Sequence, residues 1–375
     1  MNETRRQSLR VVIVGLRPPR LPLRDGYALH LYHLLRELSI KHEVHFIAPH
    51  DGLEAFEDIP GLTSHLMSPG LHDLAKDLQP LIRDLNPQVA HLVGAQMSRF
   101  VGGLSSDLPV VLGALDAPHV NIEAVTANGL PAKARKLIKR RMAMRSVKRR
   151  YGKADRVVVV SDEDAQILRQ LNPALSITSI PNGVDIAAFA HQPAVDRHSD
   201  RLLFTGALGY PPNVDAALFL VNSIFPHIRA AHPATRLALV GRDPADSVTA
   251  LDKFVGVEVV GPVEDMAESL SGATIYLCPM ISGTGIKNKL LEAMANGLPC
   301  VATPLAVRGM KVRPGVDILV ESAGEQFAEA TIRLLEDEGL RYRIGQAGFE
   351  YVSRSHTWSA MADRYETIYL ELINA

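Results

Sequence analysis

Short apolar runs alternate along the chain with longer stretches in which apolar residues recur every three or four positions. Runs such as Leu9–Val14 and Arg156–Ser161 are typical of short buried strands. Stretches such as Tyr27–Ser39 place their leucines on one face of a helix. Strands that alternate with helices in this way indicate an α/β fold with parallel sheets.

The alternation runs through the chain twice, and a polar, poorly patterned stretch separates the two halves. This stretch is His191–Asp200, which we interpret as an interdomain linker. With 375 residues, the chain is also long for a single hydrophobic core. We therefore predict an N-terminal domain at residues 1–193 and a C-terminal domain at residues 200–354.

Composition narrows the class of protein without identifying it. The chain is 47% hydrophobic and 22% charged, and its net charge of −1 indicates no general affinity for polyanions. Its two cysteines, Cys278 and Cys300, fall in predicted strands and cannot form a disulfide framework or a zinc site alone. There is no apolar signal core near the start and no run of 18 apolar residues. We expect a cytoplasmic protein, with association at the inner face of the membrane as an open alternative.

One stretch, Pro279–Pro304, carries the clearest indication of chemistry. It predicts a strand end, a glycine-rich loop, a helix at about residues 286–296 and a second strand. A loop that enters a helix start offers unpaired N–H groups and a positive dipole end, which suit a phosphate. Lys287 and Lys289 add cations where the dipole favours acids, and a bound anion is the simplest reason. Glu292 would reach the hydroxyls of an attached sugar; the alternative is a solvated helix with ordinary lysines.

The sequence Gly-Ile-Lys-Asn-Lys-Leu-Leu-Glu-Ala-Met-Ala at residues 285–295 resembles the donor-nucleotide motif of retaining glycosyltransferases of family 4. Two lesser motifs follow the family's order, Pro181–Asp185 and Phe204–Gly206. The resemblance implies the GT-B fold: two Rossmann-like parallel-sheet domains facing a central cleft, with a terminal helix at residues 355–375 packing back on the first. It places the acceptor on the N-terminal domain and the donor on the C-terminal domain.

The same resemblance implies site residues for the donor. Glu292 would hold the ribose hydroxyls, and residues 262–265 would lie beside the base. Relatives supply an Arg and a Lys to the diphosphate from the loop after the first strand of the second domain, but residues 206–213 hold no cation here. Lys287 and Lys289 are the candidates to replace them, Lys287 with a catalytic role. The residues predicted to bind the nucleotide are Gly206, Asn213, Arg242, Val263, Gly285, Ile286, Asn288, Lys289 and Glu292, and those predicted to contact the sugar are Gly283 and Thr284.

Two of these positions leave alternatives open. Arg242 follows a predicted strand and would touch phosphate or base, or else be an ordinary loop residue. The family has a second Glu on the transferred sugar where this chain has Thr284. A subgroup tied to exopolysaccharide assembly likewise lacks that Glu, so the identity of the sugar stays open.

On the acceptor side, polar residues follow predicted strands of the first domain. Asp25, Gly26 and Tyr27 resemble the family's acceptor loop, although Asp25 is equally suited to cap the following helix. Asp116 and His119 emerge together at a strand end. The resemblance places a sugar-contacting or catalytic group near them, and which of the two it is stays open.

Lys133–Lys153 is the most biased segment, with 11 Lys or Arg among 21 residues and no acid. A basic amphipathic helix is a candidate for an anionic membrane surface, and a solvated helix packed by one face is the alternative. No recognised nucleic-acid-binding module accompanies it. The acids at residues 162–164 open a predicted helix, so dipole complementarity explains them better than a metal site.

We therefore expect a retaining glycosyltransferase that moves a sugar from a nucleoside-diphosphate sugar, UDP by the frequency of such donors among relatives, to a hydroxyl acceptor. The acceptor would be a growing polysaccharide, a lipid-linked saccharide or a natural product. No metal or other cofactor is expected, since no Asp-x-Asp pattern follows a strand. The alternatives are a nucleotide-sugar epimerase or hydrolase on a similar scaffold, and a catalytically silent binding protein.

Overall fold

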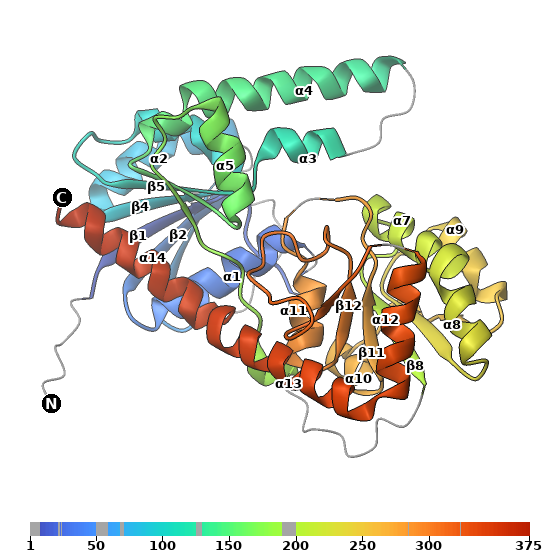
Figure 1. The fold of residues 1–375 in the computed structure, drawn as a ribbon. Helices are drawn as coiled ribbons and strands as arrows, with labels where there is room; N and C mark the ends of the chain where they lie inside the picture. The colour runs from blue at the N-terminus through green and yellow to red at the C-terminus, as the bar shows by residue number, and fades with distance from the viewer. Residues whose placement is uncertain are drawn as a thin grey trace, which may run out of the picture. The chain divides into compact units, whose positions relative to one another are not determined.

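A computed structural model describes residues 8–21, 23, 25–49, 59–67, 71–124, 130–189, 200–283, 285–322 and 324–375. The chain divides into two compact units (Figure 1). The first holds the chain up to Asn182, apart from residues 124–126, together with Trp358–Ala375; the second holds Gly183–Thr357. The division falls before residue 193, because the short helix α6 (Ile186–Phe189) packs on α11 of the second unit. Most of the predicted linker lies outside the described residues.

The first unit is built on a seven-stranded parallel sheet in the order β3-β2-β1-β4-β5-β6-β7. Apolar side chains of both faces are buried beneath helices, in two separate clusters. Its strands are β1 (Arg10–Gly15), β2 (Glu43–Pro49), β3 (Leu62–Met67), β4 (Val89–Val93), β5 (Val110–Leu115), β6 (Arg156–Val159) and β7 (Ile177–Ser179). Its helices are α1 (Gly26–Ser39), α2 (Leu71–Leu85), α3 (Pro118–Ala124), α4 (Leu130–Arg149), α5 (Asp162–Leu171) and α14 (Trp358–Ile373), with 3-10 turns at Ala95–Arg99, Val101–Gly103 and Tyr151–Lys153.

The second unit repeats the design with six parallel strands in the order β10-β9-β8-β11-β12-β13. One apolar cluster fills its core. Its strands are β8 (Arg201–Thr205), β9 (Arg236–Val240), β10 (Val257–Val259), β11 (Ile275–Cys278), β12 (Cys300–Ala302) and β13 (Leu319–Val320). Besides α6, its helices are α7 (Pro211–Phe219), α8 (Phe225–Ala231), α9 (Asp246–Thr249), α10 (Met266–Ser271), α11 (Asn288–Ala295), α12 (Glu325–Glu336) and α13 (Glu338–Ser355); a π-helical turn (Leu220–Ile224) joins α7 to α8, and Ala250–Lys253 is a 3-10 turn.

The two sheets confirm the predicted pair of Rossmann-like units. In each, the strand order reverses once, between β1 and β4 in the first and between β8 and β11 in the second. In sheets of this kind, ligands bind beyond the carboxyl ends of the strands at that reversal. The fold therefore directs attention to the loops after β8 and β11, and to those after β1, β4 and β5. The predicted cleft between the units stays a prediction.

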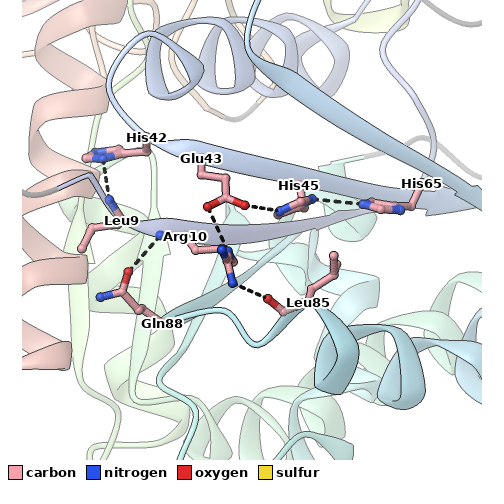
Figure 2. A network of polar contacts seen from close by, with 8 residues as sticks. All are labelled: Leu9, Arg10, His42, Glu43, His45, His65, Leu85 and Gln88. Carbon is pink, nitrogen blue, oxygen red and sulfur yellow. Dashed lines mark hydrogen bonds and ion pairs between the residues drawn. The ribbon is translucent and has the colours of Figure 1, made fainter.

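A polar ladder links the three strands at one side of the first sheet (Figure 2). Arg10 of β1 forms an ion pair with Glu43 of β2 at 2.9 Å, and Glu43 contacts the ring of His45 at 3.2 Å. His45 Nδ1 lies 3.1 Å from Nε2 of His65 on β3. Burial, and then the neighbouring His45, lower the pKa of His65. The ladder explains how β3, which has no strong apolar pattern, joins the sheet.

The terminal helix α14 packs on the first unit, as the resemblance implied for residues 355–375. Its aromatic residues lie against buried histidines of α1 and β4. The ring of Trp358 stacks on that of His33 with centroids 4.3 Å apart. The hydroxyl of Tyr369 lies 2.7 Å from His91 Nδ1. These contacts, together with apolar packing, fix α14 against α1.

Candidate functional site

The loop between β11 and α11 approaches the helix through left-handed glycines. Gly283 and Gly285 have φ angles of 98° and 71°, which other residues rarely adopt. Lys287 occupies the N-cap position, and no side chain caps the helix there. Helix α11 therefore begins at Asn288, two residues later than predicted. Its first-turn N–H groups have no partner within the helix, which is the property required for an anion site.

Lys287 is not in the first helical turn, as predicted, but inside the loop that precedes it. Its side chain is buried, and its Nζ donates a hydrogen bond of 2.7 Å to the carbonyl oxygen of Gly285. The ammonium thus braces the glycine-rich loop beside the helix start. Thr284, predicted to contact the sugar, lies outside the described residues.

Lys289 extends from α11 to the loop that follows β8. Its Nζ donates a 2.6 Å hydrogen bond to Asn213 Oδ1 on α7. The same ammonium lies 4.3 Å from the ring centroid of Phe204 on β8 and 3.8 Å from Met280 Sδ. Burial lowers the pKa of Lys289 to about 8. A cation held in a dry, mostly apolar setting gains strongly from a nearby anion.

Gly206 explains why this approach is possible. A Cβ at that position would lie 2.8 Å from Asn213 Nδ2 and 2.9 Å from Lys289 Nζ, so any side chain would displace the ammonium. The loop after β8 carries no cation of its own. Lys289 therefore brings a positive charge from α11 to that loop, between the first turns of two helices.

Glu292 follows Lys289 by three residues and lies on the same side of α11. Burial raises the pKa of its carboxyl to about 7, and the charge of Lys289 offsets part of that rise. Beneath the site, the hydroxyls of Tyr276 on β11 and Thr205 on β8 lie 2.9 Å apart. This pair joins the two strands at the reversal. The sequence did not identify it, because both residues occur within apolar strands.

The other predicted nucleotide contacts lie on neighbouring loops of the same unit. Arg242 follows β9 and forms an ion pair of 2.8 Å with the exposed carboxylate of Asp243. Val263 and Ile286 are half-buried and pack against the core. Asn288 is the first residue of α11 and is half-buried. Of the predicted set, the described contacts bring together Gly206, Asn213 and Lys289 directly.

The acceptor-loop candidates lie in the first unit, where they shape the loop after β1. Asp25 is the N-cap of α1, since its carboxylate accepts a 2.9 Å hydrogen bond from Ala28 N. It also pairs with Arg17 at 2.6 Å. The Tyr27 hydroxyl accepts a 2.6 Å hydrogen bond from Leu16 N, and burial raises its pKa to about 12. A Cβ at Gly26 would meet no atom within 4 Å, so the backbone there has open space beside it.

Asp116 and His119 follow a strained strand end. Leu115, the last residue of β5, has a φ angle of 69°, and the pairing of β5 with β6 shifts register beside it. Such a conformation costs free energy, and a functional site is a common reason for it. Asp116 is the next residue and is half-buried, whereas His119 is buried in the first turn of α3. Sequence patterns did not indicate the strain.

The acids that open α5 have structural partners. Asp164 accepts a 3.0 Å hydrogen bond from Ala117 N and a 2.6 Å one from Ser161 Oγ, which ties the loop after β5 to α5. Asp162 accepts a hydrogen bond from Ser179. Among the residues that the structure describes, no group of three His, Cys, Asp or Glu side chains is arranged to hold a metal ion.

Helix α4 exposes large apolar side chains among its basic residues. Leu137, Ile138 and Met142 are 45%, 58% and 63% exposed. Val147 of the same helix is buried and faces the first unit. Within the part of the chain that the structure describes, no helix combines the length and apolarity that a membrane crossing needs.

Two family models match the chain, one in each half. The model described as "Glycosyltransferase Family 4" matches residues 24–188, and the model described as "Glycosyl transferases group 1" matches residues 199–337. Each match covers most of one sheet unit and the candidate residues within it.

Curated relatives agree with these matches over part of their length. A phosphatidyl-myo-inositol mannosyltransferase of Mycolicibacterium smegmatis is 31% identical over 199 residues, which are 51% of this chain and 50% of that protein. A GDP-mannose-dependent monoacylated alpha-(1-6)-phosphatidylinositol monomannoside mannosyltransferase of Corynebacterium glutamicum is 28% identical over 211 residues, 50% of this chain and 55% of that protein. The alignments thus span about half the length of the curated relatives.

Solved structures resemble the chain over nearly its full length. Sucrose-phosphate synthase from Thermosynechococcus elongatus shares 17% identity with a TM-score of 0.77, covering 98% of this chain and 99% of that one. Anabaena HepE in complex with UDP shares 15% identity with a TM-score of 0.71, covering 97% and 100%. At such identities the likeness concerns the fold. From the two family matches and this fold, the chain belongs to the family 4 and group 1 glycosyltransferases and has the GT-B fold.

Proposed function

We propose that the protein transfers a sugar from a nucleoside-diphosphate sugar to a hydroxyl acceptor, with retention at the anomeric carbon and without a metal ion. The donor binds the second unit at the reversal between β8 and β11. The observation that carries this proposal is the position of Lys289, whose ammonium lies between the first turns of α7 and α11.

This arrangement suits a diphosphate leaving group. When the bond between the sugar and the diphosphate breaks, negative charge develops on the departing oxygen. Fixed N–H dipoles and a desolvated ammonium stabilise such charge without having to reorganise. Lys289 supplies the charge to the loop after β8, and Lys287 holds the glycine-rich loop in place beside it. Together they provide what a metal ion would otherwise supply.

Glu292 has the properties expected of a ribose contact. Its carboxylate accepts hydrogen bonds from the two ribose hydroxyls, and these bonds favour the ionised form. In the ligand-free protein, burial favours the protonated form. Nucleotide binding is therefore coupled to the ionisation of Glu292 near neutral pH.

The base is UDP in our preferred form of the proposal, with GDP as the main competitor. Support for UDP comes from the UDP complex of Anabaena HepE, and support for GDP from the GDP-mannose-dependent relative. Arg242 and the segment around Val263 lie on the loops that would face the base.

For the acceptor we propose a lipid-linked saccharide or a growing polysaccharide on the first unit. Asp116, which follows the strained Leu115, is our candidate for the sugar-contacting or catalytic group, and His119 is the second candidate. Names of relatives that include phosphatidylinositol acceptors support a substrate at the membrane.

Helix α4 gives that proposal a surface. Ile138 and Met142 are four residues apart, so they share one face, and Arg135, Arg141 and Arg145 lie beside them at helical spacing. Exposed apolar side chains bordered only by cations suit an anionic lipid surface, because the apolar groups enter the interface while the cations meet the headgroups.

The first experiment is a thermal-shift screen against UDP, GDP, dTDP and ADP and their sugars, with EDTA present. Ligand at 100 times the dissociation constant stabilises the folded state by about 2.7 kcal/mol. Stabilisation by one diphosphate in EDTA supports the proposal and selects the base. No stabilisation by any of them favours a silent binding protein. Release of free nucleotide or a changed sugar without an acceptor favours a hydrolase or epimerase.

A further inference from the structure

A serine–aspartate contact joins the glycine-rich loop to α7. Ser282 Oγ donates a 2.9 Å hydrogen bond to Asp215 Oδ2. Ser282 is the residue before Gly283, at the start of the loop between β11 and α11, and Asp215 lies in the second turn of α7. The motif at residues 285–295 includes neither residue, so nothing in the proposed donor site accounts for this contact.

A second contact lies beside the first. A Cβ at Gly283 would be 3.1 Å from Pro212 Cβ, so the loop backbone rests directly on the first turn of α7. Pro212 and Asp215 are three residues apart and therefore lie on one side of the helix. One side of α7 thus supplies both a buried surface beneath Gly283 and a carboxylate for Ser282.

The loop has a physical need for such an anchor. Gly283 and Gly285 adopt left-handed conformations, and glycine loses more conformational freedom on ordering than any other residue. A loop that presents N–H groups to a ligand binds more tightly when it is ordered beforehand. Asn213, on the same turn of α7, fixes Lys289 at the other end of the segment. The first two turns of α7 therefore hold residues 282–289 at both ends.

We propose that Asp215 is a positioning residue, which orders the glycine-rich loop for the donor by accepting the Ser282 hydrogen bond. It acts through Ser282 and need not touch the ligand. The proposal rests on the proposed function in so far as the ordered loop serves a nucleotide. The need is for an acceptor oxygen at this position and not for a negative charge, which separates this role from that of a sugar-binding carboxylate.

The test compares Asp215→Ala, Ser282→Ala, the double variant and Asp215→Asn by hydrogen exchange of the amides at residues 283–287, without ligand. Loss of one such hydrogen bond should raise their exchange rates about threefold to tenfold. Both single variants and the double variant should show the same increase, and Asp215→Asn should exchange like the wild type. Ser179→Ala, which removes the contact with Asp162 in the first unit, is the matched control.

Affinity for the preferred nucleoside diphosphate is the second readout, and it should fall by a similar factor in the Ala variants and not in Asp215→Asn. Unchanged exchange in Asp215→Ala would overturn the proposal. So would additive effects of the two Ala substitutions. Weak binding by Asp215→Asn with wild-type exchange would also overturn it, because it would show that the charge touches the ligand. If the wild type binds no nucleotide, the proposed function fails, while the exchange rates still decide whether the anchor exists.

Discussion

Burial of charge distinguishes the residues at the candidate donor site from ordinary surface residues. Lys289 and Glu292 were expected to share a side of α11 with Asn288, and helical spacing was enough to predict that. Spacing could not predict that Lys289 would meet Asn213 and the Phe204 ring, because those contacts depend on how α11 packs beside β8. The contact between Asp215 and Ser282 was missed for the same reason.

Glu292→Gln should make the ligand-free protein more stable and weaken nucleotide binding. With a folded-state pKa of about 7 against 4.5, the protonated carboxyl is favoured by folding, so stability is lost as pH rises from 4.5 through 7. A neutral amide avoids that loss, and we expect a gain of about 1–2 kcal/mol at pH 8 after allowing for partial solvent access. Urea unfolding at pH 8 measures it.

The same variant separates function from stability. Wild-type affinity for the nucleoside diphosphate should rise from pH 6 to pH 7.5 as Glu292 ionises, and this rise should vanish in Glu292→Gln. Calorimetric titrations across this range provide the measurement, with Glu268→Gln on α10 as the control. If Glu292→Gln binds as tightly as the wild type at pH 7.5, the ribose contact is wrong.

At the scale of elements, most helices and strands followed from apolar periodicity, and the exceptions have physical causes. The strand β3 was not predicted, because Leu62–Met67 carries polar residues on an edge of the sheet. One helix was expected at residues 214–231, but a π-helical turn divides it into α7 and α8. The first of these, α7, is the element that contacts the glycine-rich loop.

Helix α4 makes a prediction that belongs to this scale. Replacing Ile138 and Met142 together by Ser should reduce binding to vesicles that contain anionic lipid by roughly tenfold, since two apolar side chains no longer enter the interface. Binding should also fall as salt increases. Vesicle co-sedimentation is the measurement, and Val255→Ser, which alters an apolar residue that is 77% exposed in the second unit, is the control. Equal binding by the double variant and the wild type would assign α4 to the solvent.

For the whole molecule, the duplicated alternation of strands and helices predicted two parallel sheets, and the structure confirms them. Strand order could not be derived from the pattern alone, and the resemblance supplied it. The return of α14 to the first unit depends on buried contacts among His30, His91, Tyr365 and Tyr369. These residues are far apart in the sequence, and no local pattern connects them.

Those histidines should make folding sensitive to acid. Burial lowers the pKa of His30 to about 4 and that of His91 to about 3, so both are neutral in the folded state at pH 7. Because the unfolded chain binds protons at about pH 6.5, stability is complete above that value and is lost as pH falls below it. Each should cost about 2 kcal/mol between pH 7 and pH 5.

Free energies of unfolding in urea at pH 7 and pH 5 measure this loss. The variant His30→Gln with His91→Gln is expected to be less stable at pH 7 and to lose less stability on going to pH 5. An identical loss in the variant and the wild type would mean that other groups govern the acid response.

The most direct test of the central claim is the affinity of Lys289→Met for the nucleoside diphosphate. Charge-assisted hydrogen bonds contribute about 1.5–3 kcal/mol, so we predict binding about 10 to 100 times weaker than that of the wild type, in EDTA. The corresponding nucleoside, which lacks the diphosphate, should bind both proteins alike. Lys253→Met is the control, since that lysine also lies over a phenylalanine ring, 5.5 Å from the centroid, but away from the site. Equal affinity of Lys289→Met and the wild type for the diphosphate would contradict the account.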